Sequence, residues 1–257
     1  KVDRIEVASA RVSEGEFEAV KQITEWASLN GHIQDVEVLT FVDGGRSLQW
    51  MCDTGAKVQN LLTKGSLNHL THQLKQTPEQ HFKAIAEVIS EAVKLGITTN
   101  VYLEDWSNGM RNSQEYVFDF LDFLATQPVS RILLPDTLGV LTPEDTRNFI
   151  EKITNRYPEQ HFDFHAHNDY DLSVANVMEG IKAGARGIHL TVNGMGERAG
   201  NAPLASTVAV INDFFKDTID IAIKEDKLYS VSKLIEAFSG VRIPSNKPVV
   251  GKNVFTQ

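Results

Sequence analysis

The stretch HFDFHAHNDYDLSVANVMEGIKAGARGIHLTV, residues 161–192, contains one complete strand–helix–strand unit. A short strand-type run at 161–165 is followed by a helical period over 171–183. Gly184 then suits a helix end, because glycine adopts the left-handed conformation at little cost. A second strand-type run follows at 187–192. This order predicts a βαβ unit of a parallel sheet.

The same alternation continues outward along the chain. Strand-type runs are also found at 2–7, 36–41, 57–62, 97–103 and 131–134. Helical periods occupy 15–28, 47–53, 78–94, 113–125, 143–157 and 203–215. Two of these helices have clear start signals, Thr142 before Pro143 and Thr77 before Pro78. The pattern predicts repeated βα units spaced by roughly 30 residues.

Seven such units predict an α/β fold of the TIM (β/α)8-barrel type that lacks its first N-terminal βα unit. A doubly wound open sheet is the alternative, but the glycine-rich fingerprint of that fold is absent after the first run, at 8–11. We expect residues 1–217 to form the barrel, with strands 2 to 8, and residues 218–257 to form a C-terminal helix over 218–239 and the start of a linker. A plain C-terminal tail is the alternative for the last segment.

Composition limits the classes of partner. The chain carries 25 Lys and Arg against 34 Asp and Glu, a formal charge of −9, which argues against nucleic acid and anionic membranes. No apolar run is long enough to span a bilayer, and Cys52 is the single cysteine. These features favour a cytoplasmic protein, with Cys52 as a small buried apolar side chain.

The sequence HAHND begins where the strand-type run at 161–165 ends. Residues i and i+2 of a strand face the same side, so His165 and His167 can present two imidazoles to one ion. Imidazole suits zinc, manganese, iron or cobalt. Two structural histidines are the alternative, but catalytic groups of βα barrels lie at strand C-termini.

Other candidate residues follow neighbouring strands. The glycine-rich loop NGMGERAGNA, 193–202, contains Asn201, whose amide oxygen is able to complete a metal shell. Tyr102 and Glu104 share one face of a strand, and Glu104 is a candidate acid or base. Thr137 ends another strand. A salt bridge is the alternative role for Glu104, and barrel packing for Leu62. No role is assigned to His32, His69, His72, His81 and His189.

Several of these motifs together resemble the DRE-TIM metallolyase superfamily, in its 2-isopropylmalate, citramalate and homocitrate synthase branch. They are HAHNDYDLSVAN (165–176), GERAGNAPL (196–204), LLTKGS (61–66), VYLEDWSNG (101–109) and LPDTLGVLTPE (134–144). LTKGSLNHL and YLEDWSNG look most like the citramalate synthase group. The resemblance implies an acyltransferase of isoleucine or leucine biosynthesis that condenses acetyl-CoA with a metal-bound 2-oxo acid, pyruvate favoured, and releases CoA.

The resemblance also implies roles for individual residues. It makes His165, His167 and Asn201 ligands of a divalent metal, such as Zn, Mn, Mg or Co. Glu104 has the acid/base or positioning role, and Thr137 holds the carboxylate of the oxo acid. A pocket around the side chain of the oxo acid is formed by Leu39, Leu62 and Tyr102. A homodimer is implied as well.

The sequence departs from the family pattern at its start. The Arg-Asp-Glu motif of the first barrel strand has no counterpart before Lys1, so we expect weak metal binding and impaired catalysis by this chain. The regulatory domain implied by the resemblance would lie beyond Gln257, so no feedback inhibition is expected. A 3-hydroxy-3-methylglutaryl-CoA lyase is disfavoured, because the loop at 195–202 lacks the cysteine of that family. 2-Isopropylmalate or homocitrate synthase is the nearer alternative. A non-catalytic binding or interaction module is the alternative of another class.

Overall fold

The computed structural model describes residues 2–255. Residues 1, 256 and 257, which end the expected ranges 1–217 and 218–257, lie outside the described residues, and that division stays a prediction. The chain forms two compact units, which we describe separately. The N-terminal unit comprises Asp3–Thr137 and Ile153–Asp163; of the described residues, the C-terminal unit comprises Val2, Leu138–Lys152 and 164–255.

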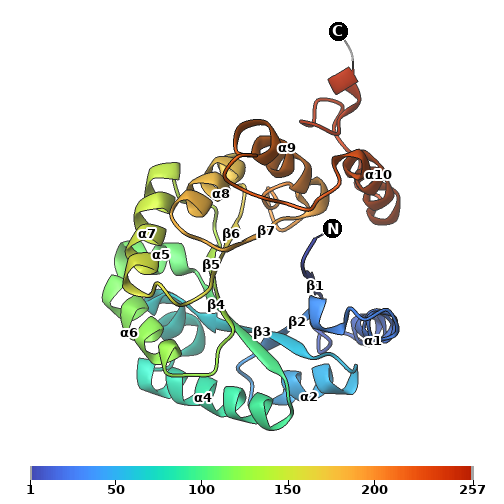
Figure 1. Ribbon diagram of the computed structural model, residues 1–257. Helices are drawn as coiled ribbons and strands as arrows, with labels where there is room; N and C mark the ends of the chain where they lie inside the picture. The colour runs from blue at the N-terminus through green and yellow to red at the C-terminus, as the bar shows by residue number, and fades with distance from the viewer. Residues whose placement is uncertain (1, 256–257) are drawn as a thin grey trace. The chain divides into compact units, whose positions relative to one another are not determined.

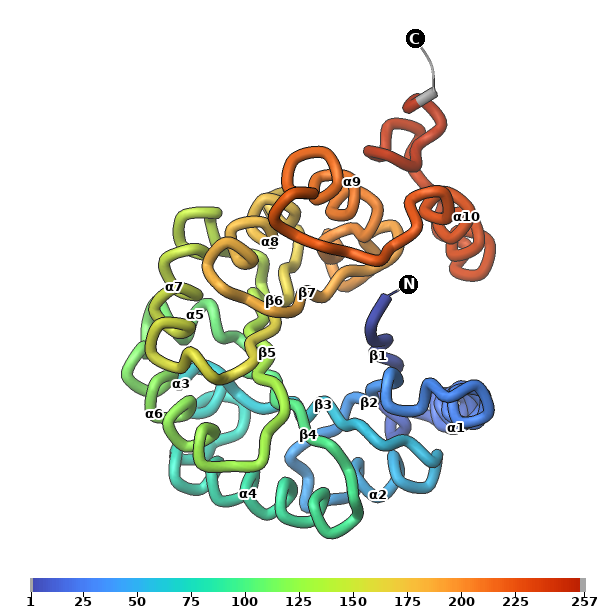
Figure 2. The backbone as a smooth tube through the Cα atoms, viewed as in Figure 1, coloured from blue at the N-terminus to red at the C-terminus, as the bar shows by residue number. Residues whose placement is uncertain are grey.

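The strands of the N-terminal unit are parallel neighbours in chain order (Figures 1 and 2). They are β1 (Ile5–Val7), β2 (Val36–Phe41), β3 (Val58–Lys64), β4 (Thr98–Glu104) and β5 (Arg131–Asp136). The helices are α1 (Glu14–Leu29), η1 (Ile33–Asp35), α2 (Arg46–Asp53), α3 (Leu67–His69), the π-helical η2 (Leu70–Leu74), α4 (Pro78–Lys94), α5 (Trp106–Asn112) and α6 (Gln114–Ala125). With β6 (Phe162–Ala166) and β7 (Gly187–His189) the order of the sheet is β1 to β7, which confirms the predicted repeat of βα units.

Hydrogen bonds identify the side chains that share one face of this sheet. Asn100 Nδ2 donates to Asn60 Oδ1 at 2.8 Å, and Asn60 Nδ2 donates to Glu37 Oε2 at 2.9 Å. Side chains two residues further along each strand point to the same face. That face therefore also carries Leu39, Leu62, Lys64, Tyr102 and Glu104.

A buried ionic network lies on the same face, nearer the strand N-termini. The Arg131 guanidinium, with 6% of the residue exposed, contacts the carboxylates of Glu37 and Asp163. His161 Nε2 lies 2.8 Å from Asp163 Oδ1, and Arg4 Nε lies 3.4 Å from Glu37 Oε1. Because a buried charge is costly unless it is paired, Arg131 is what allows two carboxylates to remain in this interior.

Helix α4 begins at the predicted cap. Thr77 Oγ1 accepts a hydrogen bond from the Gln80 backbone N–H, and the Gln80 side chain accepts one from the Thr77 backbone, with Pro78 in the first turn. Inside the helix, His81 is buried, its Nε2 accepts the backbone N–H of Lys64 at 3.1 Å, and its ring contacts Phe120. Burial first, and the charge of Lys64 second, lower the pKa of His81 to about 4.

Acid should therefore destabilise the protein through His81. In the unfolded chain a histidine binds a proton below about pH 6.5, whereas folded His81 stays neutral until about pH 4. The unfolded state thus gains protons as the pH falls through this window, and we expect a loss of about 2 kcal/mol of unfolding free energy by pH 5. Urea unfolding at pH 7 and pH 5 measures it. His81→Gln, which keeps an acceptor but does not titrate, should lose correspondingly less; equal losses in both proteins would contradict the assignment.

The C-terminal unit contains the end of β6 and the elements after it. β6 (Phe162–Ala166) and α7 (Pro143–Arg156) both cross the boundary between the units. The remaining elements are α8 (Ser173–Lys182), β7 (Gly187–His189), η3 (Val192–Gly194), α9 (Leu204–Phe214), η4 (Glu225–Lys227), α10 (Leu228–Ser239) and η5 (Lys252–Phe255). No helix within residues 2–255 is both long and apolar enough to cross a membrane.

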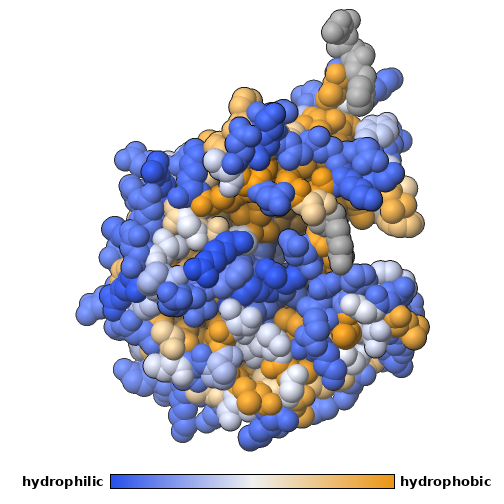
Figure 3. Space-filling view, in the orientation of Figure 1, coloured by the Kyte–Doolittle hydropathy of each residue, from blue (hydrophilic) through white to orange (hydrophobic). Residues whose placement is uncertain are grey.

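The prediction of a helix at 218–239 is correct only for the second half of that range. Helix α10 covers its second half, whereas 218–224 is not helical. In that part isoleucines alternate at 219, 221 and 223, which is a period of two rather than 3.6. Ile221 and Ile223 pack against a buried cluster that includes Val208 and Leu228. Apolar surface remains alongside α10 (Figure 3), where Leu234 and Phe238 are exposed.

Candidate active site

The predicted metal ligands all lie in the C-terminal unit, where β6 ends. His167 and Asn201 form an antiparallel β-bridge, and two further backbone hydrogen bonds hold the glycine-rich loop along the same strand end. Ala202 N–H donates to Ala166 O at 3.0 Å, and Asn168 N–H donates to Gly200 O at 2.9 Å. The loop and the HAHND segment, separated by some thirty residues of helix and strand, are thus brought together by backbone pairing.

The two histidine rings lie next to each other. Their centroids are 5.0 Å apart with an angle of 69° between the ring planes, and the His189 ring contacts His165 at 5.6 Å. Burial first, and then His189 and His167, lower the pKa of His165 well below its ordinary value. His165 is therefore neutral at physiological pH, the form in which imidazole binds a metal.

Asn201 supplies an oxygen beside these rings. Its Nδ2 donates to the Met195 carbonyl at 3.0 Å, which fixes the amide and leaves Oδ1 buried with no hydrogen-bond partner. An unbonded buried amide oxygen next to two imidazoles fits a divalent cation, for which nitrogen and oxygen donors are suitable. Within residues 2–255 no group of three or more His, Cys, Asp or Glu residues is placed to hold a metal ion.

The path of the loop depends on close backbone contact. Gly200 has φ +85°, and a Cβ there would overlap the carbonyl oxygen of Gly194, which accepts the Asn201 N–H at 3.1 Å. A bidentate ion pair adds a second restraint, because Arg198 Nε and Nη2 lie 2.7 and 2.8 Å from the two Asp169 oxygens. Hydrogen bonding to Arg198 lowers the pKa of Asp169. The loop is thus fastened to the residues that follow His167.

The other predicted residues lie in the N-terminal unit. Glu104 ends β4, is paired in register with Lys64, and its Oε2 contacts the Lys64 ammonium group. The alternative of a salt bridge for Glu104 is therefore present in the structure. It does not remove the carboxylate from solvent, since 21% of the side chain is exposed. A carboxylate that is paired yet accessible can still exchange a proton with a bound substrate.

The expected pocket residues share the face that carries Glu104. Leu62 and Tyr102 are register partners, and Leu39 lies on the neighbouring strand. Leu39 and Leu62 are half-buried, so apolar surface remains open beside them. Tyr102 is buried, and burial first and Glu6 second raise its pKa well above the ordinary value. Tyr102 is therefore a neutral hydroxyl in this site.

Thr137 lies directly after β5 and contacts the strand end of Glu104. Its Oγ1 accepts the backbone N–H of Asp105 at 2.8 Å. This bond holds Asp105 in a left-handed conformation with φ +64°, which is uncommon outside glycine and costs backbone energy. Thr137 thus helps to fix the backbone conformation of Asp105, the residue after Glu104.

Sequence reasoning missed the residues around this turn. β3 extends two residues beyond the predicted end, which brings Lys64 onto the site face, and the short helix α3 places His69 near Glu104 and Asp105. A signal existed for Lys64, since the period of two through Asn60 and Leu62 continues to it. None existed for His69, because a three-residue helix is too short to produce a period.

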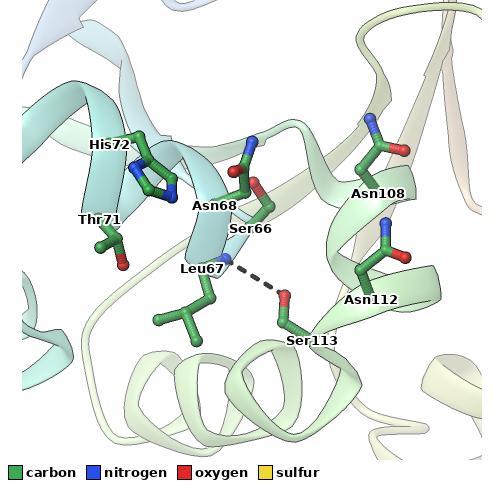
Figure 4. Close-up of a pocket in the computed structure, with 8 residues that line it drawn as sticks. All are labelled: Ser66, Leu67, Asn68, Thr71, His72, Asn108, Asn112 and Ser113. Carbon is green, nitrogen blue, oxygen red and sulfur yellow. Dashed lines mark hydrogen bonds between the residues drawn. The ribbon is translucent and has the colours of Figure 1, made fainter.

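A polar hollow lies beside the same turn (Figure 4). Its volume is about 530 Å³, and it is lined by residues of the β3–α4 connection and of α5 with the residue after it: Ser66, Leu67, Asn68, Thr71, His72, Asn108, Asn112 and Ser113. The Leu67 N–H donates to Ser113 Oγ at 3.2 Å and joins the two sides. Most of its lining residues carry uncharged hydroxyl or amide groups, and Ser66 and Asn108 among them bond to Asp105, the residue after Glu104.

Comparison with known proteins gives the family to which the chain belongs. A family model described as HMGL-like matches residues 1–235. The chain belongs to the HMGL-like family. It is 32% identical over 99% of its length to a putative (R)-citramalate synthase of Methanopyrus kandleri, and 34% identical over 99% to a probable 2-isopropylmalate synthase of Ignicoccus hospitalis. A homocitrate synthase of Saccharolobus islandicus is 37% identical over 73% of the chain and 39% of its own length.

The HMGL-like chain is shorter than these relatives, since it spans 48% of the first and 61% of the second. Among solved structures, an HMG-CoA lyase from Acinetobacter baumannii has a TM-score of 0.75 at 20% identity, over 99% of this chain and 85% of the lyase. An HMG-CoA lyase from Pseudomonas aeruginosa has a TM-score of 0.71 at 16% identity, over 87% and 80%. The predicted resemblance and the predicted barrel-type α/β fold without a full barrel are therefore confirmed.

Proposed function

We propose that the protein condenses acetyl-CoA with a 2-oxo acid, with pyruvate as the favoured acceptor and citramalate as the product. The observation that carries the proposal is the ring of neutral His165 next to the ring of His167, beside the unbonded amide oxygen of Asn201. Sequence identity to citramalate, 2-isopropylmalate and homocitrate synthases supports the reaction class.

In this proposal the divalent metal would be held by His165, His167 and Asn201 and would polarise the oxo group of the acceptor as a Lewis acid. Glu104 takes a proton from the methyl group of acetyl-CoA, and the resulting carbanion forms the new bond to the oxo carbon. The oxo oxygen gains a proton, and water then cleaves the thioester to release CoA and the new carboxylate. Mg and Co, like Zn and Mn, remain candidate metals.

The remaining residues bind the acceptor. Thr137 donates its hydroxyl hydrogen to the carboxylate of the oxo acid, a role that its position next to Asp105 at the strand end of Glu104 supports. Leu39, Leu62 and the neutral Tyr102 surround the side chain of the oxo acid. A homodimer and the expected impairment of this chain stay predictions.

We expect the difference in transition-state free energy between competing 2-oxo acids to be modest. A hydrophobic pocket distinguishes one methylene by about 1–3 kcal/mol, and 2-oxoisovalerate has two more carbons than pyruvate, so we expect pyruvate to exceed 2-oxoisovalerate by at least about tenfold in kcat/KM. The assay follows thiol release from acetyl-CoA with pyruvate, 2-oxoisovalerate or 2-oxoglutarate and identifies each product by mass spectrometry.

The outcomes separate the alternatives. Preference for 2-oxoisovalerate or 2-oxoglutarate would assign 2-isopropylmalate or homocitrate synthase activity instead. Cleavage of 3-hydroxy-3-methylglutaryl-CoA without condensation would assign a lyase. No thiol release with any acceptor, and no retained metal, would favour a non-catalytic binding module.

A further inference from the structure

His69 lies between two carboxylates at the end of β4. Its Nδ1 is 3.7 Å from Glu104 Oε1, and its Nε2 is 3.5 Å from Asp105 Oδ2. Lys64 Nζ contacts the other Glu104 oxygen, Oε2. Each oxygen of Glu104 therefore faces a different nitrogen group.

Asp105 is a fixed anchor for the ring. Only 1% of the residue is exposed, and its two oxygens accept hydrogen bonds from Ser66 Oγ at 2.6 Å and Asn108 Nδ2 at 2.8 Å. Its backbone N–H is held by Thr137. Because Asp105 is fixed by groups from three segments, the ring nitrogen next to it has a defined position.

The backbone of His69 is fixed as well. Ser66 caps α3, and its Oγ accepts the His69 N–H at 3.1 Å while donating to Asp105. Gly65 allows this turn to lie against β4, since a Cβ there would overlap the Leu103 backbone. The side chain of His69 is 15% exposed, and Nδ1 is buried with no hydrogen-bond partner. That nitrogen therefore has an unused bonding position toward Glu104.

We propose that His69 is a positioning residue for Glu104, restricting rotation of its carboxylate through Nδ1 while Asp105 holds Nε2. The inference rests on the proposed acid/base role of Glu104. The terminal torsion of a glutamate is otherwise broad, so a carboxylate held at one oxygen by a flexible lysine keeps several orientations. Contact at the second oxygen selects one of them before substrate binds, and this lowers the cost of reaching the reactive geometry.

Two amide substitutions separate the two ring nitrogens. His69→Asn places an amide NH2 near the Nδ1 position, whereas His69→Gln places one near Nε2. We expect His69→Gln to lower kcat on the order of 10²-fold, as a small misplacement of a reacting group does, with KM unchanged. His69→Asn should recover most of that loss. The matched pair His72→Asn and His72→Gln, on an exposed residue three positions along that lines the hollow in Figure 4, should leave kcat unchanged.

A second measurement does not depend on activity. Urea unfolding of His69→Ala, Glu104→Gln and the double variant forms a double-mutant cycle, and we expect the double variant to lose less stability than the sum of the single losses. Additive losses would overturn the inference, as would wild-type kcat in His69→Gln or equal losses in His69→Gln and His69→Asn. If the wild type condenses no 2-oxo acid, the proposed function fails, and the cycle alone then decides whether His69 is coupled to Glu104.

Discussion

His165→Ala and His167→Ala are each expected to reduce the divalent metal that the chain retains to background and to lower kcat on the order of 10³-fold. Loss of one imidazole leaves a single ring and the amide of Asn201, too few protein donors for a stable site. The size of the kinetic effect follows because Lewis-acid stabilisation is worth several kcal/mol and each 1.4 kcal/mol is about tenfold.

The measurement is metal content by mass spectrometry after dialysis against Zn or Mn, together with kcat. His72→Ala serves as the control, because His72 is an exposed histidine in the other unit and should leave the metal content unchanged. His165→Gln keeps the bulk of the side chain and separates ligand loss from a packing defect. Full metal content in both alanine variants would exclude these histidines as ligands.

Arg131→Met is expected to destabilise the protein by about 3–5 kcal/mol. The guanidinium contacts the buried carboxylates of Glu37 and Asp163, and its removal leaves two negative charges without this partner in the sheet interior. The free-energy cost of leaving the two buried carboxylates without their arginine partner exceeds the stability gained by packing the apolar methionine side chain. Urea unfolding at pH 7 gives the difference in free energy.

A matched control uses an exposed arginine. Arg156 pairs with Asp122 at 2.6 Å on the surface, so Arg156→Met should cost less than about 1 kcal/mol. Neutralising the carboxylates in the triple variant Arg131→Met, Glu37→Gln and Asp163→Asn should restore part of the stability. A loss below about 1 kcal/mol in Arg131→Met, matching the surface control, would show that the network is not a stabilising feature.

Sequence reasoning located most of the βα units and the ends of several strands. β2 occupies the predicted range 36–41, and β4 lies within one residue of its predicted ends. Such strands were predictable because they are short runs rich in β-branched and aromatic residues, and the glycines and caps around them are local signals. The predicted pair His165 and His167 needed only the strand period of two.

The parts that escaped prediction depend on tertiary contacts. α3 and α5 follow tight turns at Gly65 and Asp105, and helices of three and seven residues carry too little period to be recognised. The approach of His69 to Glu104 arises from Ser66 bonding to a residue 39 positions away. No local pattern encodes that separation, so a histidine without an assigned role became a neighbour of the candidate base.

The close contact between Gly200 and Gly194 helps to fix the backbone path of the loop without using the side chains at its exposed positions. Main-chain contacts between Gly194, Gly200 and Asn201, together with the Arg198–Asp169 ion pair, hold this segment in place, so its exposed side chains at 195 and 197 are not needed for that. Met195 and Glu197 are partly or fully exposed on this frame. Exchanging them should therefore leave the path of the backbone unchanged.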